Sequence, residues 1–396
     1  MLDAEFDPEE NARGDSDSEA EYPTALLDAP QASSIGLLFT EVGEGSGWAA
    51  ALLLGVSFGE DDDGNARMCD WDWEHVCYAA ERGDADMVSL FLRAGADIEV
   101  ESEDGDTLLL LACKWGHLKQ SNTHFELAKI LLGKGANPFA ANDCRDTPLL
   151  WTCKAGDLQF AKMLLDKMAY EEQRWMGEHT SGANDAGDTP LLAALEAGNA
   201  ELARELVNRG AEVWPANKQG NTPLLLACKA GDLEFANILL QLHSGVNYFL
   251  GNEEVSAANA QGETPLLMVC KAGDLEFAQV LLDRGADASV AVHFATERRD
   301  EKLLGVLVSA GADLDIKGPG GNTPLLLTCK AGDLDFAQML LDNGADASAA
   351  NAHGDTPLLA ALAAGNAQLA RELVARGAAV EVSRADGGNV RGLDHG

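Results

Sequence analysis

The sequence predicts an all-α protein, a solenoid of about nine helix-turn-helix units joined by short β-hairpin loops. Three observations lead to this prediction: a Thr-Pro-Leu-Leu motif recurs along the chain, its spacing is built on 33 residues, and several units end in Gly-Ala-Asp. Recurrence at this period indicates a repeat protein, because a single helix pair cannot bury its apolar face and must stack on its neighbours.

Nearly identical segments establish the repeat. Residues 221–236 read NTPLLLACKAGDLEFA, and residues 322–337 read NTPLLLTCKAGDLDFA. The motif threonines lie at positions 107, 147, 189, 222, 264, 323 and 356, so insertions of seven or nine residues lengthen some units. The interval of 59 residues after position 264 contains a shortened copy that ends at residue 313, and another degenerate copy ends at residue 97. Together these copies give nine units.

Each unit contains signals for two helices. Thr222 is expected to cap the first helix and Pro223 to occupy its first position, where a missing N–H costs nothing. Gly231 ends that helix, and Asp232 caps the second, whose apolar residues recur at helical spacing. Glycine of the Gly-Ala-Asp segment ends the second helix because it adopts the left-handed conformation. The polar stretch 259–262 before the next threonine predicts a turn at the tip of a hairpin.

Composition sets the predicted domains and excludes some partners. The chain has 28 Lys+Arg and 65 Asp+Glu, a formal net charge of −37, which argues against nucleic acid or an anionic membrane as the main partner. Residues 1–64 are predicted to be an acidic, largely disordered extension whose apolar part, 36–58, covers the first unit. The repeat array is predicted over 65–380, followed by a flexible tail over 381–396.

The beginning of the chain and its cysteines predict the compartment. The first residues lack the cationic and apolar pattern of a secretory signal, and the early apolar run is too short to span a bilayer. Eight cysteines without such a signal favour a reducing environment. We therefore expect an intracellular protein, cytoplasmic or nuclear, with no stable membrane insertion.

The repeated segments resemble the ankyrin repeat, whose mark is T-P-L-H-x-A at a 33-residue period with a Gly-Ala-Asp ending. Leucine replaces the usual histidine of the family in six units, which predicts more apolar stacking between them. Five of these leucines are Leu192, Leu225, Leu267, Leu326 and Leu359. The resemblance implies a solenoid that recognises other proteins on its concave surface, without catalysis and without a cofactor.

Residues that could support catalysis or bind a metal ion form no recognisable motif. The eight histidines do not follow the repeat, none belongs to HExxH, and no serine lies in GxSxG. Cys69, His75 and Cys77 could contribute to a zinc site, but a fourth ligand is missing and packing is the preferred interpretation. Five cysteines share one position of the repeat and are predicted to be small buried side chains. They are Cys113, Cys153, Cys228, Cys270 and Cys329.

A lysine follows each of these five cysteines and gives the first group of predicted partner-binding residues. This lysine row consists of Lys114, Lys154, Lys229, Lys271 and Lys330, and Glu196 and Ala363 interrupt it. In the ankyrin repeats that the chain resembles, this position lies on the concave surface. One interpretation is that the row binds an acidic segment of a partner, or the chain's own acidic extension.

The other interpretation of the lysine row is tandem duplication, with each lysine paired locally to an acid that caps a second helix. Those acids are Asp157, Asp232, Asp274 and Asp333. Exposed pairs of this kind contribute only about 0–1 kcal/mol.

Aromatic residues in the loops form the second group. Trp175, Trp214, Tyr248 and Phe249 fall on consecutive hairpin regions, and tryptophan and tyrosine are enriched at interface hot spots. Alternatively, these rings fold back and cover the loops themselves.

The function predicted from both groups is non-catalytic protein recognition, as a scaffold, adaptor or inhibitor. Self-association, with the acidic extension of one copy in the concave surface of another, is the alternative, and a substrate-carrying part of an enzyme is a third.

Overall fold

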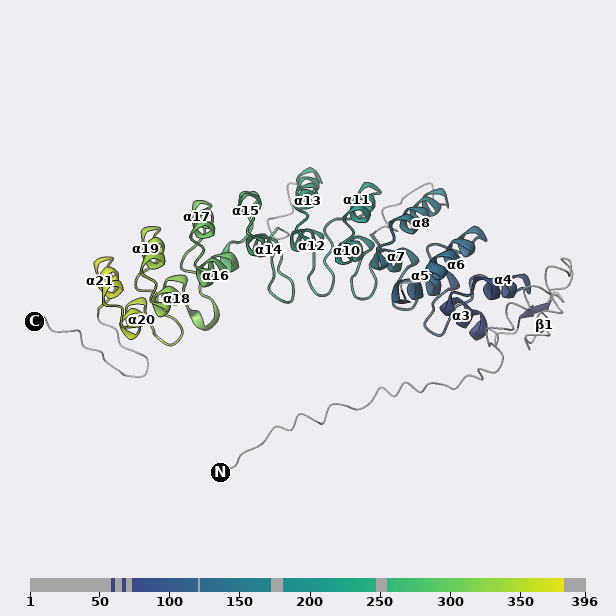
Figure 1. Cartoon of the computed structure of the whole chain (residues 1–396), viewed down its shortest axis with the longest axis horizontal. Helices are drawn as coiled ribbons and strands as arrows, with labels where there is room; N and C mark the ends of the chain where they lie inside the picture. The colour runs from purple at the N-terminus through teal and green to yellow at the C-terminus, as the bar shows by residue number, and fades with distance from the viewer. Residues whose placement is uncertain are drawn as a thin grey trace, which may run out of the picture. The chain divides into compact units, whose positions relative to one another are not determined.

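The fold is described by a computed structural model over residues 58–60, 66–68, 73–119, 122–171, 181–246 and 255–380. The chain divides into two compact units, the first with residues 1–115 and 122–136, the second with residues 116–121 and 137–396. The described residues form nine helix pairs, which confirms the number of repeats predicted (Figure 1).

The described residues of the first unit start with a small antiparallel sheet, in which β1 (Phe58–Glu60) pairs with β2 (Ala66–Met68). This sheet straddles the boundary predicted at residue 64 between the extension and the array. The helices that follow are α3 (Trp73–Arg82), α4 (Ala85–Arg93), α5 (Leu108–Lys119) and α6 (Asn122–Gly133). The last residues of α5 belong to the second unit. The predicted extension before residue 58 and the predicted tail after residue 380 lie outside the described residues.

The second unit contains seven helix pairs in its described residues. Their bounds are α7 (Pro148–Ala155), α8 (Leu158–Glu171), α10 (Pro190–Glu196), α11 (Ala200–Asn208), α12 (Pro223–Ala230), α13 (Leu233–Val246), α14 (Pro265–Ala272), α15 (Leu275–Asp283), α16 (Ser289–Arg298), α17 (Glu301–Ser309), α18 (Pro324–Ala331), α19 (Leu334–Asp342), α20 (Pro357–Ala363) and α21 (Ala367–Ala375). First helices pack on first helices and second helices on second helices, so the unit has two parallel rows (Figure 1).

The capping signals act as the sequence predicts. Thr222 accepts a hydrogen bond from the N–H of Leu225 at 3.1 Å, and Pro223 begins α12. Gly231 ends α12 with φ of +75°, a conformation that glycine adopts without strain. Asp232 then accepts the N–H of Phe235 at 3.0 Å and starts α13. Local chemistry therefore fixes where each helix begins and ends.

One apolar core runs through the second unit. Phe160, Phe235 and Phe336, one from each of three second helices, are at most 2% exposed. Leu225, which stands where the family usually has histidine, is fully buried, and four of its five counterparts are buried as well. Complete burial of a leucine stabilises the fold by about 1.5–3 kcal/mol. Apolar stacking thus joins adjacent repeats, as the substitution of histidine by leucine predicts.

Tight turns connect one repeat to the next, and we call them fingers. The fingers of the second unit are residues 142–146, 184–188, 217–221, 259–263, 318–322 and 351–355. In finger 217–221, the N–H of Asn217 donates to the carbonyl of Asn221 and the N–H of Gly220 donates to the carbonyl of Asn217. The predicted hairpin tips are therefore turns closed by these two hydrogen bonds. The 3-10 turn η3 (Pro319–Gly321) lies in finger 318–322.

Candidate partner-binding surface

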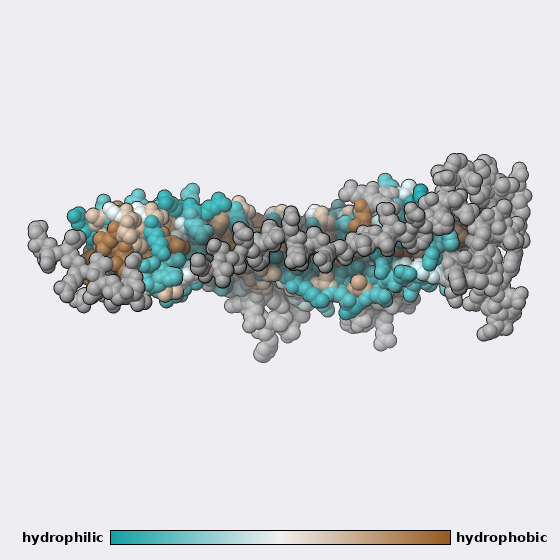
Figure 2. All heavy atoms as spheres, turned by 90° about the horizontal axis from the view of Figure 1, so that it is seen from below, coloured by the Kyte–Doolittle hydropathy of each residue, from teal (hydrophilic) through white to brown (hydrophobic). Residues whose placement is uncertain are grey.

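The lysine row lies on first helices. Lys154, Lys229, Lys271 and Lys330 occupy the last turns of α7, α12, α14 and α18 in the second unit. Lys114 lies on α5 within the first unit. Figure 2 looks onto the side from which the fingers project, where hydrophilic residues cover much of the described surface. The four lysines of the second unit therefore repeat along one row of helices.

Most lysines of the row form ion pairs with the acid that precedes a motif threonine. The Nζ atom of Lys229 lies 2.8 Å from a carboxylate oxygen of Glu263, and that of Lys154 lies 3.9 Å from Asp188. Lys330 donates to the side-chain oxygen of Asn322 at 2.9 Å and lies 3.8 Å from Asp355. In the first unit, Lys114 pairs with Asp106 at 2.6 Å.

The predicted pairing with the capping acids is wrong. Asp232 accepts a backbone N–H of α13 and pairs with Arg204 at 2.9 Å. Asp333 likewise caps α19 and pairs with Arg299 at 3.3 Å. The capping carboxylates are already engaged at the start of the second helix. Meanwhile, repeat stacking brings the acid of the neighbouring finger to the lysine.

Hydrogen bonds lower the pKa of one carboxylate on this surface, whereas burial raises the pKa of another. The hydrogen bond from Lys229, followed by that from Asn259, lowers the pKa of Glu263. Glu196, which interrupts the lysine row, has a raised pKa because of burial and the nearby charge of Asp188. The surface thus alternates paired charges rather than presenting a continuous basic stripe.

Lys271 differs from the other lysines of the row. Among the described residues, no carboxylate lies within 4 Å of its Nζ atom, although its charge contributes to lowering the pKa of Glu263. The next repeat begins with Ser289 and Val290 on α16, where the other repeats have an acid or asparagine followed by threonine. Lys271 therefore keeps a charge that no described side chain neutralises by direct contact.

An aromatic and cationic cluster near the start of the second unit was not predicted. The Nζ atom of Lys154 lies 4.6 Å from the ring centroid of Trp151, and the His117 ring lies 5.6 Å from the same indole. Burial, and then the charge of Lys154, lower the pKa of His117. The indole nitrogen of Trp151 is buried and has no hydrogen-bond partner among the described residues. Trp151 occupies a helix position where other repeats have Leu226 or Met268, so hydrophobic periodicity alone classes it as core.

The predicted aromatic group is only partly described. Trp214 is half-buried and packs against the core of the second unit. Trp175, Tyr248 and Phe249 lie outside the described residues, so their gathering on adjacent loops stays a prediction.

The repeat cysteines are buried, as predicted. Cys113, Cys153, Cys228, Cys270 and Cys329 are at most 4% exposed. Burial raises the pKa of Cys228, Cys270 and Cys329 to about 12, so these thiols stay protonated near neutral pH. His75 is exposed whereas Cys77 is buried, and Cys69 lies outside the described residues. Within the described part of the chain, no cluster of three His, Cys, Asp or Glu could hold a metal ion.

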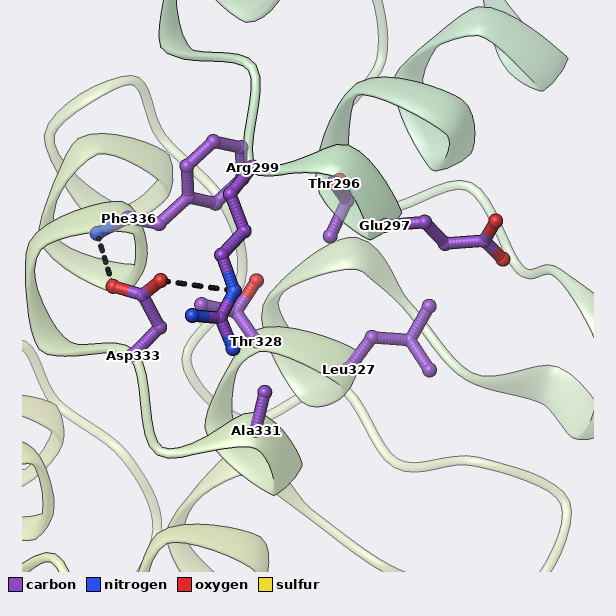
Figure 3. Close-up of a pocket in the computed structure, with 8 residues that line it drawn as sticks. All are labelled: Thr296, Glu297, Arg299, Leu327, Thr328, Ala331, Asp333 and Phe336. Atoms are coloured by element: carbon purple, nitrogen blue, oxygen red, sulfur yellow. Dashed lines mark hydrogen bonds and ion pairs between the residues drawn. The ribbon is translucent and has the colours of Figure 1, made fainter.

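A small pocket of about 220 Å³ lies between α16, α18 and the start of α19 (Figure 3). Arg299 and Asp333 face each other across it, and the dashed lines in Figure 3 mark their ion pair and the cap of Asp333 on Phe336. Arg299 has φ of +55° at a position where other repeats have glycine. The ion pair between Arg299 and Asp333 joins two consecutive repeats. Across the described residues, no helix is both long and apolar enough to cross a membrane.

Comparison with known proteins places this fold in a family. The family described as "Ankyrin repeats (3 copies)" matches residues 118–217, 174–249, 214–291 and 292–384, and the chain belongs to the ankyrin repeat family. It is also similar to "Ankyrin repeat and SOCS box protein 16" of Mus musculus, with 39% identity over 88 residues. That match covers 22% of this chain and 19% of the relative, so the chain spans about a fifth of the relative's length. Ankyrin repeats are, as a class, protein-binding modules that act without catalysis.

Proposed function

We propose that the first-helix and finger surface of the second unit holds a partner protein without transforming it chemically, as a scaffold, adaptor or inhibitor. The observation that carries this proposal is the lysine row. Lys229 and Lys330 have side chains 53% and 42% exposed, and they lie on equivalent turns of stacked helices. Charges held at regular intervals on a packed framework suit recognition, because less ordering entropy is lost on binding.

The ion pairs of the row still allow it to bind an acidic segment. An exposed pair contributes only about 0–1 kcal/mol, so a partner carboxylate can replace the internal acid at small cost. Trp151 with Lys154 and the predicted anchors Trp175, Trp214, Tyr248 and Phe249 would add apolar contact area. The net charge of −37 makes nucleic acid a poor partner. The free thiols of the described residues are compatible with work in the cytoplasm or the nucleus.

The test uses partners captured by crosslinking to the full chain in native cell extract and then purified. The triple variant Lys154→Glu, Lys229→Glu and Lys330→Glu should weaken binding by about tenfold or more and reduce its salt dependence. Lys302→Glu, an exposed change on the second helix α17, is the matched control. Unchanged affinity and unchanged salt dependence in the triple variant would show that the lysine row is not the binding surface.

A second arm of this test examines the aromatic residues. Trp151→Ala and Trp214→Ala should lower affinity for the partner if the rings contact it. A large fall in melting temperature with unchanged affinity would instead assign these rings to packing.

A further inference from the structure

One finger is missing from the row of the second unit. The residues that cap α15 and α17, Asp274 and Asp300, are 26 residues apart, whereas Asp300 and Asp333 are 33 apart. The shortened repeat contains Asp287-Ala-Ser and continues at once with Val290, whereas residues 346–348 have the same sequence and are followed by seven residues before the threonine. Those seven residues, 349–355, contain the whole finger 351–355 in the last repeat. The shortened repeat therefore lacks a finger, and we call this position the finger gap.

Finger 318–322, on one side of the gap, is adapted to having no preceding neighbour. In finger 217–221 the side chain of Asn217 donates to Asp188 at 3.0 Å, and the N–H of Lys218 donates to the carbonyl of Ala186 at 2.9 Å. The corresponding residues of finger 318–322 are Gly318, which has no side chain, and Pro319, which has no N–H. In other fingers, the asparagine side chain and the next backbone N–H both donate to the preceding finger. Finger 318–322 lacks both of these donors.

Packing accounts for the glycine in that finger. A Cβ atom on Gly318 would lie 2.5 Å from Nε2 of His293, a side chain on α16, so a larger residue does not fit there. On its other side the finger still bonds normally, since Asn351 donates to the side-chain oxygen of Asn322 at 2.9 Å. The edge that faces the gap has therefore lost its donors, whereas the edge that faces finger 351–355 keeps its hydrogen bond.

Finger 259–263, on the other side of the gap, keeps groups that the missing finger would have engaged. The carbonyl of Gln219 accepts the N–H of Ala260 at 2.8 Å, but the equivalent carbonyl of Gln261 accepts no hydrogen bond from the described residues. Lys271 has no ion pair among the described residues, because the residue that precedes the threonine in a full-length repeat, an acid in most of them, is absent together with the finger. Val290 is 41% exposed, whereas Thr264 and Thr323 at the equivalent position are 6% and 0% exposed.

We infer that the finger gap binds a tight acidic turn of a partner protein, which supplies what the missing finger would supply. The turn donates a backbone N–H to the carbonyl of Gln261, places a carboxylate beside Lys271 and covers Val290. The array itself indicates the chemistry of this occupant, because Asp188 and Glu263 of neighbouring fingers form the ion pairs with Lys154 and Lys229. This inference rests on the proposed function and names one place and one kind of partner segment for it.

The test uses the full chain and a cyclised, fluorescein-labelled peptide with residues 346–356, which contains the finger of the last repeat. Fluorescence anisotropy should show saturable, salt-sensitive binding. Lys271→Glu should weaken it about tenfold or more, and so should Asp355→Asn in the peptide, while Lys302→Glu leaves it unchanged. Absence of binding up to roughly 1 mM peptide, or equal binding to the Lys271→Glu protein, would overturn the inference.

A second variant fills the finger gap and distinguishes a partner protein from the other possible occupants of the gap. Insertion of the residues 349–355 between Ser289 and Val290 restores the length of the repeat, and it should abolish peptide binding while circular dichroism stays helical. A partner that binds the filled variant as tightly as wild type refutes this inference and leaves the proposed function standing. If removal of residues 1–57 strengthens peptide binding, the occupant is the chain's own acidic extension. If filling the gap lowers the mass measured by light scattering, the occupant is a second copy.

Discussion

Asn217 connects neighbouring fingers, and its replacement by alanine should lower the free energy of unfolding by about 3 kcal/mol. Asn217 is 7% exposed, and its side-chain oxygen accepts the N–H groups of Gln219 at 3.1 Å and Asn221 at 3.0 Å. Its nitrogen donates to Asp188 at 3.0 Å across to the preceding finger. Alanine removes all three hydrogen bonds. Two bonds between neutral groups contribute about 1 kcal/mol each, and a bond to a carboxylate contributes about 1.5 kcal/mol or more.

Guanidinium unfolding followed by far-UV circular dichroism measures this loss. Asp188→Ala removes the bond between fingers together with the 3.9 Å ion pair to Lys154, and it should cost about 1–2 kcal/mol. Asp188→Asn keeps an acceptor, as Asn221 and Asn322 do naturally for Asn259 and Asn351, and should cost less than about 1 kcal/mol. If Asn217→Ala stays within about 0.5 kcal/mol of wild type, the fingers are not a stabilising part of the array.

Three further predictions concern caps, thiols and carboxylates. Thr222→Ala should lower the free energy of unfolding by about 1 kcal/mol in the same assay, and Thr222→Ser should restore it. Burial raises the pKa of Cys228 to about 12, so native protein at pH 8 should react quickly with Ellman's reagent at exposed Cys144 and slowly at Cys228. An unfolded thiol ionises above about pH 8.5 whereas a buried one does not, so each buried thiol should make stability fall as pH rises, by about 2 kcal/mol at pH 10. Cys228→Ala should reduce the total fall by about that amount in urea titrations at about pH 8 and pH 10. Lys229→Ala should raise the pKa of Glu263, because it removes the hydrogen bond that lowers it, and carboxyl NMR titration measures that shift.

The helix pairs could be predicted because their signals are local. Thr222 and Pro223 start α12 and Gly231 ends it, all within ten residues of chain. Each of these residues acts through its own backbone preference or through a hydrogen bond three residues away. The number of repeats, the burial of the repeat cysteines and the place of the lysines on first helices follow from the same signals.

The partners of the lysines could not be predicted from such signals. Lys229 and Glu263 are 34 residues apart, and only the stacking of α12 on α14 brings them to 2.8 Å. The sequence shows capping acids much nearer in the chain, but those acids bond the backbone of the second helix. The contact between Trp151 and Lys154 could not be predicted either. A tryptophan at a position where other repeats have leucine or methionine fits the apolar pattern whether or not its ring contacts a cation.

The ion pairs also determine where charge can contribute to binding. A partner carboxylate that approaches Lys229 must displace Glu263, so it exchanges one ion pair for another of similar energy. A carboxylate that approaches Lys271 displaces only water, because the acid of the next repeat is absent, and it gains a pair without losing one. The lysine row looks uniform in sequence, yet the structure makes its members unequal. Electrostatic selectivity should therefore be concentrated at the finger gap, where a deletion of seven residues left one cation without its acid.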